Sequence, residues 1–197
     1  MGRILGDDAA ADVFAAKAQT VKDAVNEHLW MEDKGYYAQY LAGRVDDILY
    51  TKSETLGNSL AILYGVAEGE RAMRLSQSAP VVDFGAPVFW PWIPDMAPYH
   101  NRAVWPFVQS YWIQASAKTG NEPGVLHGIA AVWRAAMMYA TNKENFVAND
   151  GNWKGTQVNS SNMLWSLSGS LSITFRTLMG INYEGPDAIR FAPVVPK

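Results

Sequence analysis

Residues 96–107, MAPYHNRAVWPF, crowd aromatic side chains, a histidine, an arginine and two prolines into one short stretch. A plain loop would be rich in Gly, Ser and Asn, and a plain core helix would not hold Pro, His, Asn and Arg together. Pro106 suits the first turn of a helix, because the N–H that proline lacks is unbonded there in any case. The stretch therefore predicts an ordered loop that ends at a helix N-terminus and borders a site.

Prolines mark the whole segment before this helix as a break in the helical pattern. Six of the ten prolines of the chain fall here, namely Pro80, Pro87, Pro91, Pro94, Pro98 and Pro106. The aromatic content of residues 79–105 favours a long ordered loop over a disordered one. A second long polar loop is predicted over residues 141–159, TNKENFVANDGNWKGTQVN.

Hydrophobic spacing predicts helices on both sides of the two loops. They cover residues 7–29, a segment capped by Ser53, residues 68–78, residues 106–120, a segment opened by Pro123, and a last helix capped by Ser160 or Ser161 and ended by Gly180. The side chains expected to face inward on the last two helices are Leu126, Ile129, Ala130, Trp133, Met137, Leu164, Leu167, Leu171, Phe175 and Leu178. Residues 36–51 predict a short hairpin, and residues 188–196 predict an extended tail.

Broad apolar helix faces with little surface charge suit helices that pack on both sides. We therefore expect an all-α fold in which helical hairpins form part of a two-layered toroid, with a short β excursion. The chain has 197 residues, of which 49% are hydrophobic and 18% are charged, and this composition fits one domain over residues 1–197.

Composition also excludes several classes of function. The net charge is −3 and no Lys/Arg cluster occurs, which argues against a nucleic-acid partner. The sequence contains no long uncharged apolar run, so we expect no transmembrane helix. The first residues also lack the apolar core of a signal peptide. Cysteine is absent, and its absence does not decide the compartment. The scattered histidines and the lack of known motifs predict no metal ion and no cofactor.

The loop before Pro106 is the first candidate site. A helix N-terminus offers free N–H groups and a partial positive charge. Polar side chains there can hydrogen-bond hydroxyl groups of a ligand, and aromatic rings can stack on a ligand ring. The candidate residues are Trp90, Trp92, Tyr99, His100, Asn101, Arg102 and Trp105. The alternative is that the aromatic residues of this loop only fill the space between two helices.

Two further candidates lie in and after the second loop. Glu144 can act as a general base if a pocket holds it, whereas a loop glutamate is more commonly solvated. Asn162 and Trp165 can face a cavity, although polar residues at a helix start usually act as caps.

Three segments together resemble the C-terminal half of bacterial six-hairpin glycosidases, closest to the α-glucosidases of glycoside hydrolase family 63. They are residues 53–72 (SETLGNSLAILYGVAEGERA), 99–108 (YHNRAVWPFV) and 159–181 (NSSNMLWSLSGSLSITFRTLMGI). The resemblance implies an (α/α)6 toroid that cleaves an oligosaccharide or another glycoside.

The resemblance also implies roles for individual residues. Glu144-Asn145-Phe146 is similar to an ENY-like motif of these enzymes, with Phe in place of Tyr. This similarity implies that Glu144 is the general base and that Asn145 belongs to the substrate-binding residues. The loop residues Tyr99 to Trp105 match the border of the sugar pocket, and Trp165 matches an aromatic residue of the last helix.

One departure from the family pattern bears on activity. A glycosidase needs two carboxyl groups, and in the resembling enzymes the general acid lies upstream, in a half of the barrel that has no counterpart here. Asp95 is supported as a second carboxylate only by its proximity in sequence. We therefore expect a portion of a larger enzyme that meets a missing N-terminal half or self-associates. The alternatives are a non-catalytic carbohydrate-binding protein and a helical interaction domain.

Overall fold

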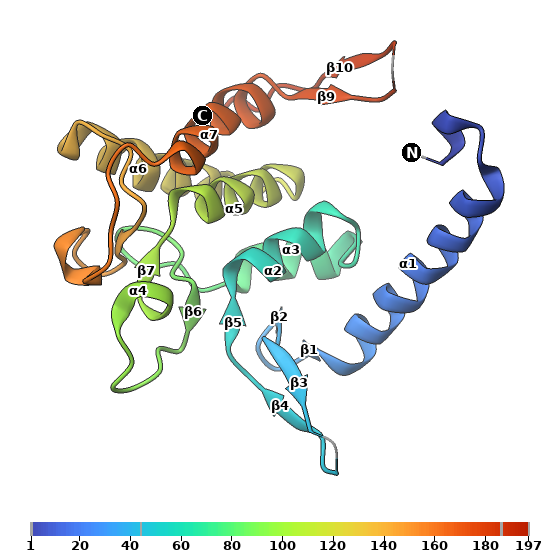
Figure 1. Ribbon diagram of the computed structural model, residues 1–197, viewed down its shortest axis with the longest axis horizontal. Coiled ribbons are helices and arrows are strands. Elements are labelled where there is room, and N and C mark those ends of the chain that lie inside the picture. The colour runs from blue at the N-terminus through green and yellow to red at the C-terminus, as the bar shows by residue number, and fades with distance from the viewer. Residues whose placement is uncertain (1, 44, 186, 197) are drawn as a thin grey trace.

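The computed structural model describes residues 2–43, 45–185 and 187–196 (Figure 1). The α-helices are α1 (Asp8–His28), α2 (Thr55–Leu63), α3 (Gly69–Ser78), α4 (Pro98–Asn101), α5 (Pro106–Lys118), α6 (Glu122–Tyr139) and α7 (Leu164–Ser172). Two short 3-10 helices are η1 (Arg3–Leu5) and η2 (Lys154–Thr156), and α7 continues as a π-helical segment, η3 (Ile173–Leu178). The strands are β1 (Trp30–Met31), β2 (Tyr36–Tyr37), β3 (Tyr40–Ala42), β4 (Ile48–Tyr50), β5 (Ser53–Glu54), β6 (Phe89–Trp90), β7 (Ala103–Val104), β8 (Phe146–Val147), β9 (Ile181–Tyr183) and β10 (Ile189–Phe191).

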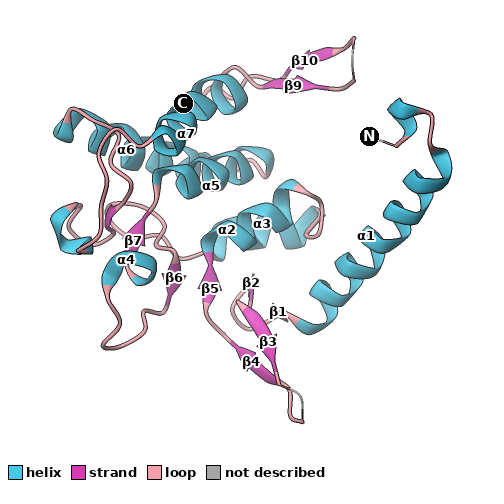
Figure 2. Ribbon diagram, in the orientation of Figure 1, coloured by secondary structure: helices cyan, strands magenta, loops and turns pink. Residues whose placement is uncertain are grey.

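The expectation of an all-α toroid is wrong. About 50% of the protein is helical and 13% lies in strands, which pair as small antiparallel two-stranded units (Figure 2). In the part of the chain that the structure describes, the helices form no toroid. The hairpin expected within residues 36–51 is present as β3 and β4, but most other strands were missed because each spans only two or three residues, which is too short to show an alternating pattern in the sequence.

Helix α5 is the centre of the packing and contacts α2, α6 and α7. Its apolar residues Trp112, Ile113 and Ala115 are buried, as are its polar residues Gln109, Ser110 and Ser116. Glycine lets α7 approach closely, because a Cβ added at Gly169 would lie only 3.0 Å from the Pro106 carbonyl oxygen. Because α2, α6 and α7 pack against different sides of α5, its buried residues are not confined to one helix face.

Helices α6 and α7 turn small residues toward α5 and large apolar residues outward. On α7 and η3 the buried positions are Ser166, Gly169, Ile173 and Thr177, whereas Leu164, Leu167, Leu171 and Phe175 are exposed. On α6 the buried positions are Val125, Gly128, Ala131 and Val132, whereas Leu126, Ala130, Trp133 and Met137 are exposed. The predicted inward faces of these helices are therefore largely wrong. The physical reason is that small side chains permit the close helix contact with α5.

The N-terminal half has its own apolar cluster. Tyr36, Tyr37, Ile62 and Leu75 are buried between the β1–β2 hairpin, α2 and α3. The predicted Ser53 cap is wrong, because Glu54 accepts hydrogen bonds from the backbone N–H groups at the start of α2. A glutamate carboxylate reaches these N–H groups from the last residue of β5.

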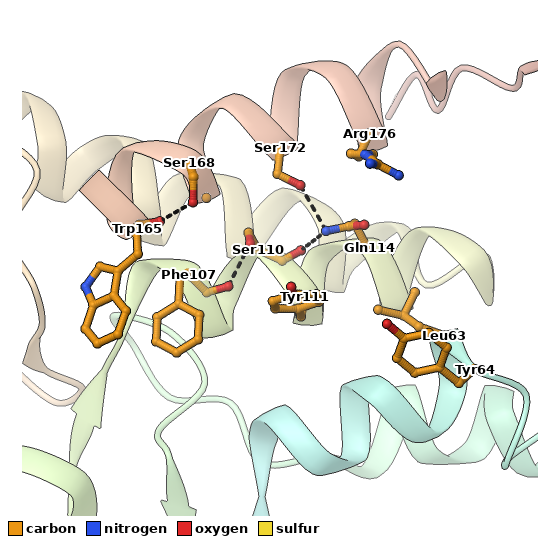
Figure 3. A pocket seen from close by; sticks show the side chains of 11 residues that line it. Leu63, Tyr64, Phe107, Ser110, Tyr111, Gln114, Trp165, Ser168, Ser172 and Arg176 are labelled. Carbon is orange, nitrogen blue, oxygen red and sulfur yellow. Dashed lines mark hydrogen bonds between the residues drawn. The ribbon is translucent and has the colours of Figure 1, made fainter. Parts of the chain in front are cut away.

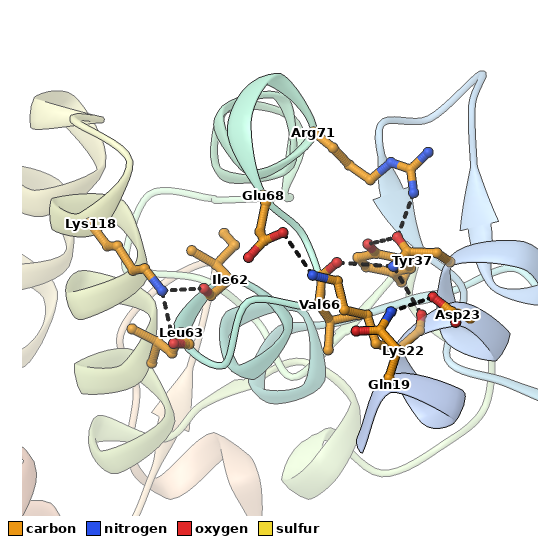
Figure 4. Close-up of polar contacts among 11 residues, drawn as sticks. Gln19, Lys22, Asp23, Tyr37, Ile62, Leu63, Val66, Glu68, Arg71 and Lys118 are labelled. Atoms are coloured by element: carbon orange, nitrogen blue, oxygen red, sulfur yellow. Dashed lines mark hydrogen bonds and ion pairs between the residues drawn. The ribbon is translucent and has the colours of Figure 1, made fainter. Parts of the chain in front are cut away.

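Helix α1 extends away from the other helices (Figure 1) and has no buried residue. The prediction of a helix over residues 7–29 is confirmed, with Asp7 as its N-cap. Among the described residues, the contacts that hold α1 lie toward its C-terminal end, since Lys22 pairs with Glu68 (Figure 4) and Asn26 donates to the Val66 carbonyl.

No helix in the described part of the chain combines the length and the apolar character that a membrane span requires.

Candidate functional site

Two loops far apart in the sequence lie side by side at the candidate site. Strand β7 pairs with β8 in an antiparallel register that sets Ala103 opposite Val147 and Val104 opposite Phe146. The backbone N–H of Ala148 also donates to the carbonyl of Arg102 at 2.8 Å. This short ladder joins the loop after residue 79 to the loop after residue 141, and it brings Glu144 next to α4.

Tyr99 and Glu144 form the polar centre of the site. The Tyr99 hydroxyl donates to Glu144 Oε1 at 2.6 Å, and the Glu144 residue is only 6% exposed. This hydrogen bond is the main cause that raises the pKa of Tyr99 to about 12, with burial and the Glu144 charge acting in the same direction. The phenol therefore remains protonated at neutral pH and holds one carboxylate oxygen in place.

The backbone also fixes Glu144. Its N–H donates to the Ser160 carbonyl at 3.0 Å, and Lys143 next to it donates to Ser161 Oγ at 2.6 Å. The predicted caps Ser160 and Ser161 therefore hold the second loop, whereas α7 begins at Leu164 without a side-chain cap. The prediction that Ser160 or Ser161 caps the last helix is therefore wrong.

An aromatic cluster surrounds the hydroxyl of Tyr99 and reaches the surface. The Trp105 ring stacks on His100 with centroids 5.1 Å apart, and it meets the Tyr99 ring edge-on at 4.9 Å. Trp105 also contacts Trp165 at 5.5 Å, and Trp165 stacks on Phe107 at 4.9 Å. The resulting chain of rings runs from the buried carboxylate to Trp165, which is 42% exposed.

Two predicted site residues hold the loops together. Asn101 is fully buried, and it accepts from the Ile93 N–H and donates to the carbonyls of Ile93 and Met96. Asn145 is also fully buried, and its side chain donates to the Val158 carbonyl and accepts from Asn159. Their side-chain groups are engaged by protein partners, and their contact with a ligand stays a prediction.

The remaining predicted residues lie apart from the ring cluster. Trp90 and Trp92 meet edge-on at 5.1 Å, and the Arg102 guanidinium lies 5.7 Å from the Trp92 ring centroid. Asn162 is exposed and forms a hydrogen-bonded pair with Thr141. Asp95 is exposed, and no hydrogen bond or ion pair joins it to Glu144.

A groove adjoins the exposed end of the ring cluster. It has a volume of about 590 Å³ and lies between α5, α7 and the end of α2 (Figure 3). Among the residues that line it are Phe107, Ser110, Tyr111, Gln114, Trp165 and Arg176. Phe107 and Trp165 lie side by side at one end and Arg176 lies at the other. Glu144 is not among the residues that line this groove.

Sequence reasoning missed most of this groove. Ser110 and Gln114 are spaced by four residues on α5, as are Ser168 and Ser172 on α7, so each pair lies on one helix face. Gln114 donates to Ser172 Oγ at 3.0 Å across the two helices. Matching polar pairs on the two apolar helices α5 and α7 were the signal that could have located the groove.

Comparison with known proteins adds no family assignment. No protein-family model matches the chain, and no curated protein matches its sequence. Within residues 2–43, 45–185 and 187–196 there is also no group of three or more His, Asp or Glu side chains that could hold a metal ion.

Proposed function

We propose that this chain binds glycosides and that Glu144 is the general base of an inverting glycoside hydrolysis. The observation that carries the proposal is the buried Glu144 carboxylate, one oxygen of which accepts a hydrogen bond from Tyr99. A general base needs a fixed position and one oxygen that is free to take a proton. The resemblance of residues 99–108 and 144–146 to six-hairpin glycosidases supports the same role.

The geometry divides the two oxygens of Glu144 between two tasks. Oε1 is held by Tyr99, whereas Oε2 accepts no hydrogen bond from the residues that the structure describes. In the proposed reaction a water molecule donates to Oε2. The water oxygen attacks the anomeric carbon as the water proton passes to Glu144. At the same time the bond between the anomeric carbon and the leaving oxygen breaks, and an acid protonates the leaving oxygen.

The proposal requires a second carboxyl group about 6.5–9.5 Å from Glu144. Asp95, which was considered from the sequence, is exposed, whereas a general acid needs a pocket that raises its pKa. We propose that a second polypeptide segment supplies the acid, as the upstream half of the barrel does in the resembling enzymes. This segment would come either from a longer chain or from another subunit.

The test is sugar release from a panel of aryl α- and β-glycosides and neutral oligosaccharides. The wild-type protein, Glu144→Gln and the control Glu70→Gln are compared in the complete assembly that includes the acid-bearing segment, because both carboxyl groups are needed for hydrolysis. Glu70 serves as the control because it is an exposed carboxylate on α3. We expect release by the wild type and by Glu70→Gln, and a loss of about 100-fold or more in Glu144→Gln. Equal release by Glu144→Gln would remove Glu144 from the mechanism.

Carbohydrate binding without hydrolysis is the second candidate function. The stacked pair of Phe107 and Trp165 at the mouth of the groove favours it, since an exposed aromatic face can bind a sugar ring. Titration calorimetry with neutral oligosaccharides separates the two candidates. Binding of oligosaccharides by the complete assembly, with no sugar released from the panel, would support the second candidate and overturn the first.

A further inference from the structure

A second cavity continues the groove beyond Arg176. It has a volume of about 500 Å³ and shares Leu63, Gln114 and Arg176 with the first cavity. We call the first cavity the aromatic compartment and the second the basic compartment. Lys118, Arg176, Thr177, Asn182 and Arg190 line the basic compartment, and no Asp or Glu is among its lining residues.

The three cations of the basic compartment have different partners. Lys118 donates to the carbonyls of Ile62 and Leu63 at 2.9 Å each (Figure 4), and Arg190 pairs with Glu184 on the neighbouring turn. Arg176 has no carboxylate partner in the described part of the chain, and its guanidinium lies 5.9 Å from the Tyr183 ring centroid. Arg176 and Lys118 both lack an ion pair among the described residues, and Arg176 is the one that also donates no hydrogen bond to a described acceptor.

A buried hydroxyl beside Arg176 also lacks a partner. Thr177 lines the basic compartment and is 2% exposed, and its buried Oγ1 has no hydrogen-bond partner among the described residues. Buried polar groups normally have a partner, so such a group indicates a missing water molecule or ligand. Arg176 and Thr177 lie in the π-helical segment η3, and π-helical turns occur frequently at functional sites.

The separation of the two ends indicates the length of the ligand. Trp165 and Arg176 are eleven residues apart on one helical segment, which corresponds to about 16 Å at 1.5 Å per residue. Ser110, Gln114 and Ser172 offer polar groups between them. The groove therefore suits an extended ligand with a ring at one end, hydroxyls along its length and an anionic group at the other end.

We propose that the groove binds an acidic oligosaccharide, with a sugar ring on Phe107 and Trp165 and a carboxylate or sulfate on Arg176 and Thr177. This inference rests on the proposed function only in taking the ligand to be a carbohydrate. It goes further by naming acidic sugar chains as the preferred ligand. A guanidinium binds a planar carboxylate or a sulfate through paired N–H donors.

The test is titration calorimetry of the full chain with three probes of equal length. They are a tetrasaccharide of galacturonic acid, a sulfated neutral tetrasaccharide and the unmodified neutral tetrasaccharide. We expect at least one acidic probe to bind about 10-fold more tightly than the neutral one. The acidic probe that binds more tightly identifies which anion Arg176 receives. Inorganic sulfate is titrated alone, and binding as tight as that of the acidic probes would show a simple anion site and overturn the proposal.

Two variants and one control locate the effect. Arg176→Gln should remove the preference for the acidic probe, whereas Arg3→Gln, which removes the same charge from an exposed ion pair with Asp12, should keep it. Thr177→Val removes the unpartnered hydroxyl at constant shape. It should weaken acidic binding about 3-fold or more if the hydroxyl contacts the ligand. Unchanged preference in both Arg176→Gln and Thr177→Val would overturn the proposal.

The outcomes separate this inference from the proposed function. Equal affinity of the wild type for all three tetrasaccharides, or no binding of any of them, overturns the acidic-ligand proposal. Sugar release that depends on Glu144 would stand in either case. Conversely, a preference for acidic probes that depends on Arg176 supports this proposal even if Glu144→Gln leaves sugar release unchanged.

Discussion

The hydroxyl of Tyr99 donates a 2.6 Å hydrogen bond to the carboxylate of Glu144, although the two residues are 45 positions apart in the sequence. The β7–β8 pairing brings their loops together, and Asn101 holds the loop that precedes Tyr99. The polar centre of the site therefore depends on the folding of both long loops. The site can therefore be tested through the stability and the titration of loop variants, without a known substrate.

Tyr99 should titrate at unusually high pH. Its pKa is raised to about 12 from an ordinary 10.0, mainly by the hydrogen bond to Glu144. Since the raised pKa belongs to the folded state, the stability it confers is fully present below pH 10 and is lost as the pH rises toward 12. The pKa values of Tyr36, Tyr37, Tyr40 and Tyr139 are also raised, so Tyr99 is identified by difference: ultraviolet titration should show a contribution near pH 12 in the wild type that is missing in Tyr99→Phe. A titration curve that Tyr99→Phe does not change would contradict the assigned hydrogen bond.

Asn101→Ala should destabilise the protein by about 2–4 kcal/mol, because it strands several buried hydrogen-bonding groups of the loop backbone. Asn149→Ala is the control, since Asn149 is exposed, and it should change stability by less than about 0.5 kcal/mol. Urea unfolding measures both values. Equal midpoints for the two variants would show that Asn101 does not hold the loop.

Gly169→Ala should destabilise the contact between α5 and α7. The new Cβ would lie 3.0 Å from the Pro106 carbonyl oxygen and 3.1 Å from the Phe107 Cα, so one of the helices must shift. We expect a loss of about 1–3 kcal/mol in the free energy of unfolding. Ser168→Ala on the exposed face of α7 should be close to neutral. A neutral Gly169→Ala would mean that the two helices pack less closely than described.

The exposed apolar residues of α7 and η3 should cause self-association. Leu164, Leu171 and Phe175 are each between 47% and 76% exposed, and large exposed apolar patches commonly mark contact sites. Light scattering should show dimers or larger species for the wild type and a shift toward monomer for Leu171→Glu. A monodisperse wild-type monomer at high concentration would contradict this prediction.

Helix positions were largely accessible from the sequence. The predicted helix over residues 7–29 is α1 (Asp8–His28), that over residues 68–78 is α3 (Gly69–Ser78), and Pro106 begins α5. A hairpin was expected within residues 36–51, and β3 and β4 pair there. These elements were found because local signals, such as an N-cap, a first-turn proline or a turn, determine them.

Helix orientation was not accessible from apolar spacing alone. Leu167 and Leu171 suggested the inward face of the last helix, but the buried residues there are Ser166, Gly169, Ile173 and Thr177, most of which are small. Two helices in close contact need small residues at their interface. Small residues such as Gly and Ser do not appear in a pattern of large apolar residues, so the pattern pointed to the wrong face. The fold class was wrong for a related reason, since the strands that join the two loops are only two residues long.

The candidate site was predicted in part. Tyr99, Trp105, Glu144 and Trp165 were named from the sequence, and the structure links them through ring contacts and the Tyr99–Glu144 hydrogen bond. The groove along α5 and its basic compartment were missed. Their residues, such as Gln114 and Arg176, meet only when α5 and α7 pack together.

Chemical rescue of Glu144→Ala with formate tests the role of Glu144 most directly. The smaller side chain leaves space in which a free carboxylate can take the proton that Glu144 would take. We predict that hydrolysis falls by about 100- to 10,000-fold and that added formate restores part of it, while the wild type does not respond. Unchanged hydrolysis by Glu144→Ala, or a loss that formate does not relieve, would contradict the assignment of Glu144 as the general base.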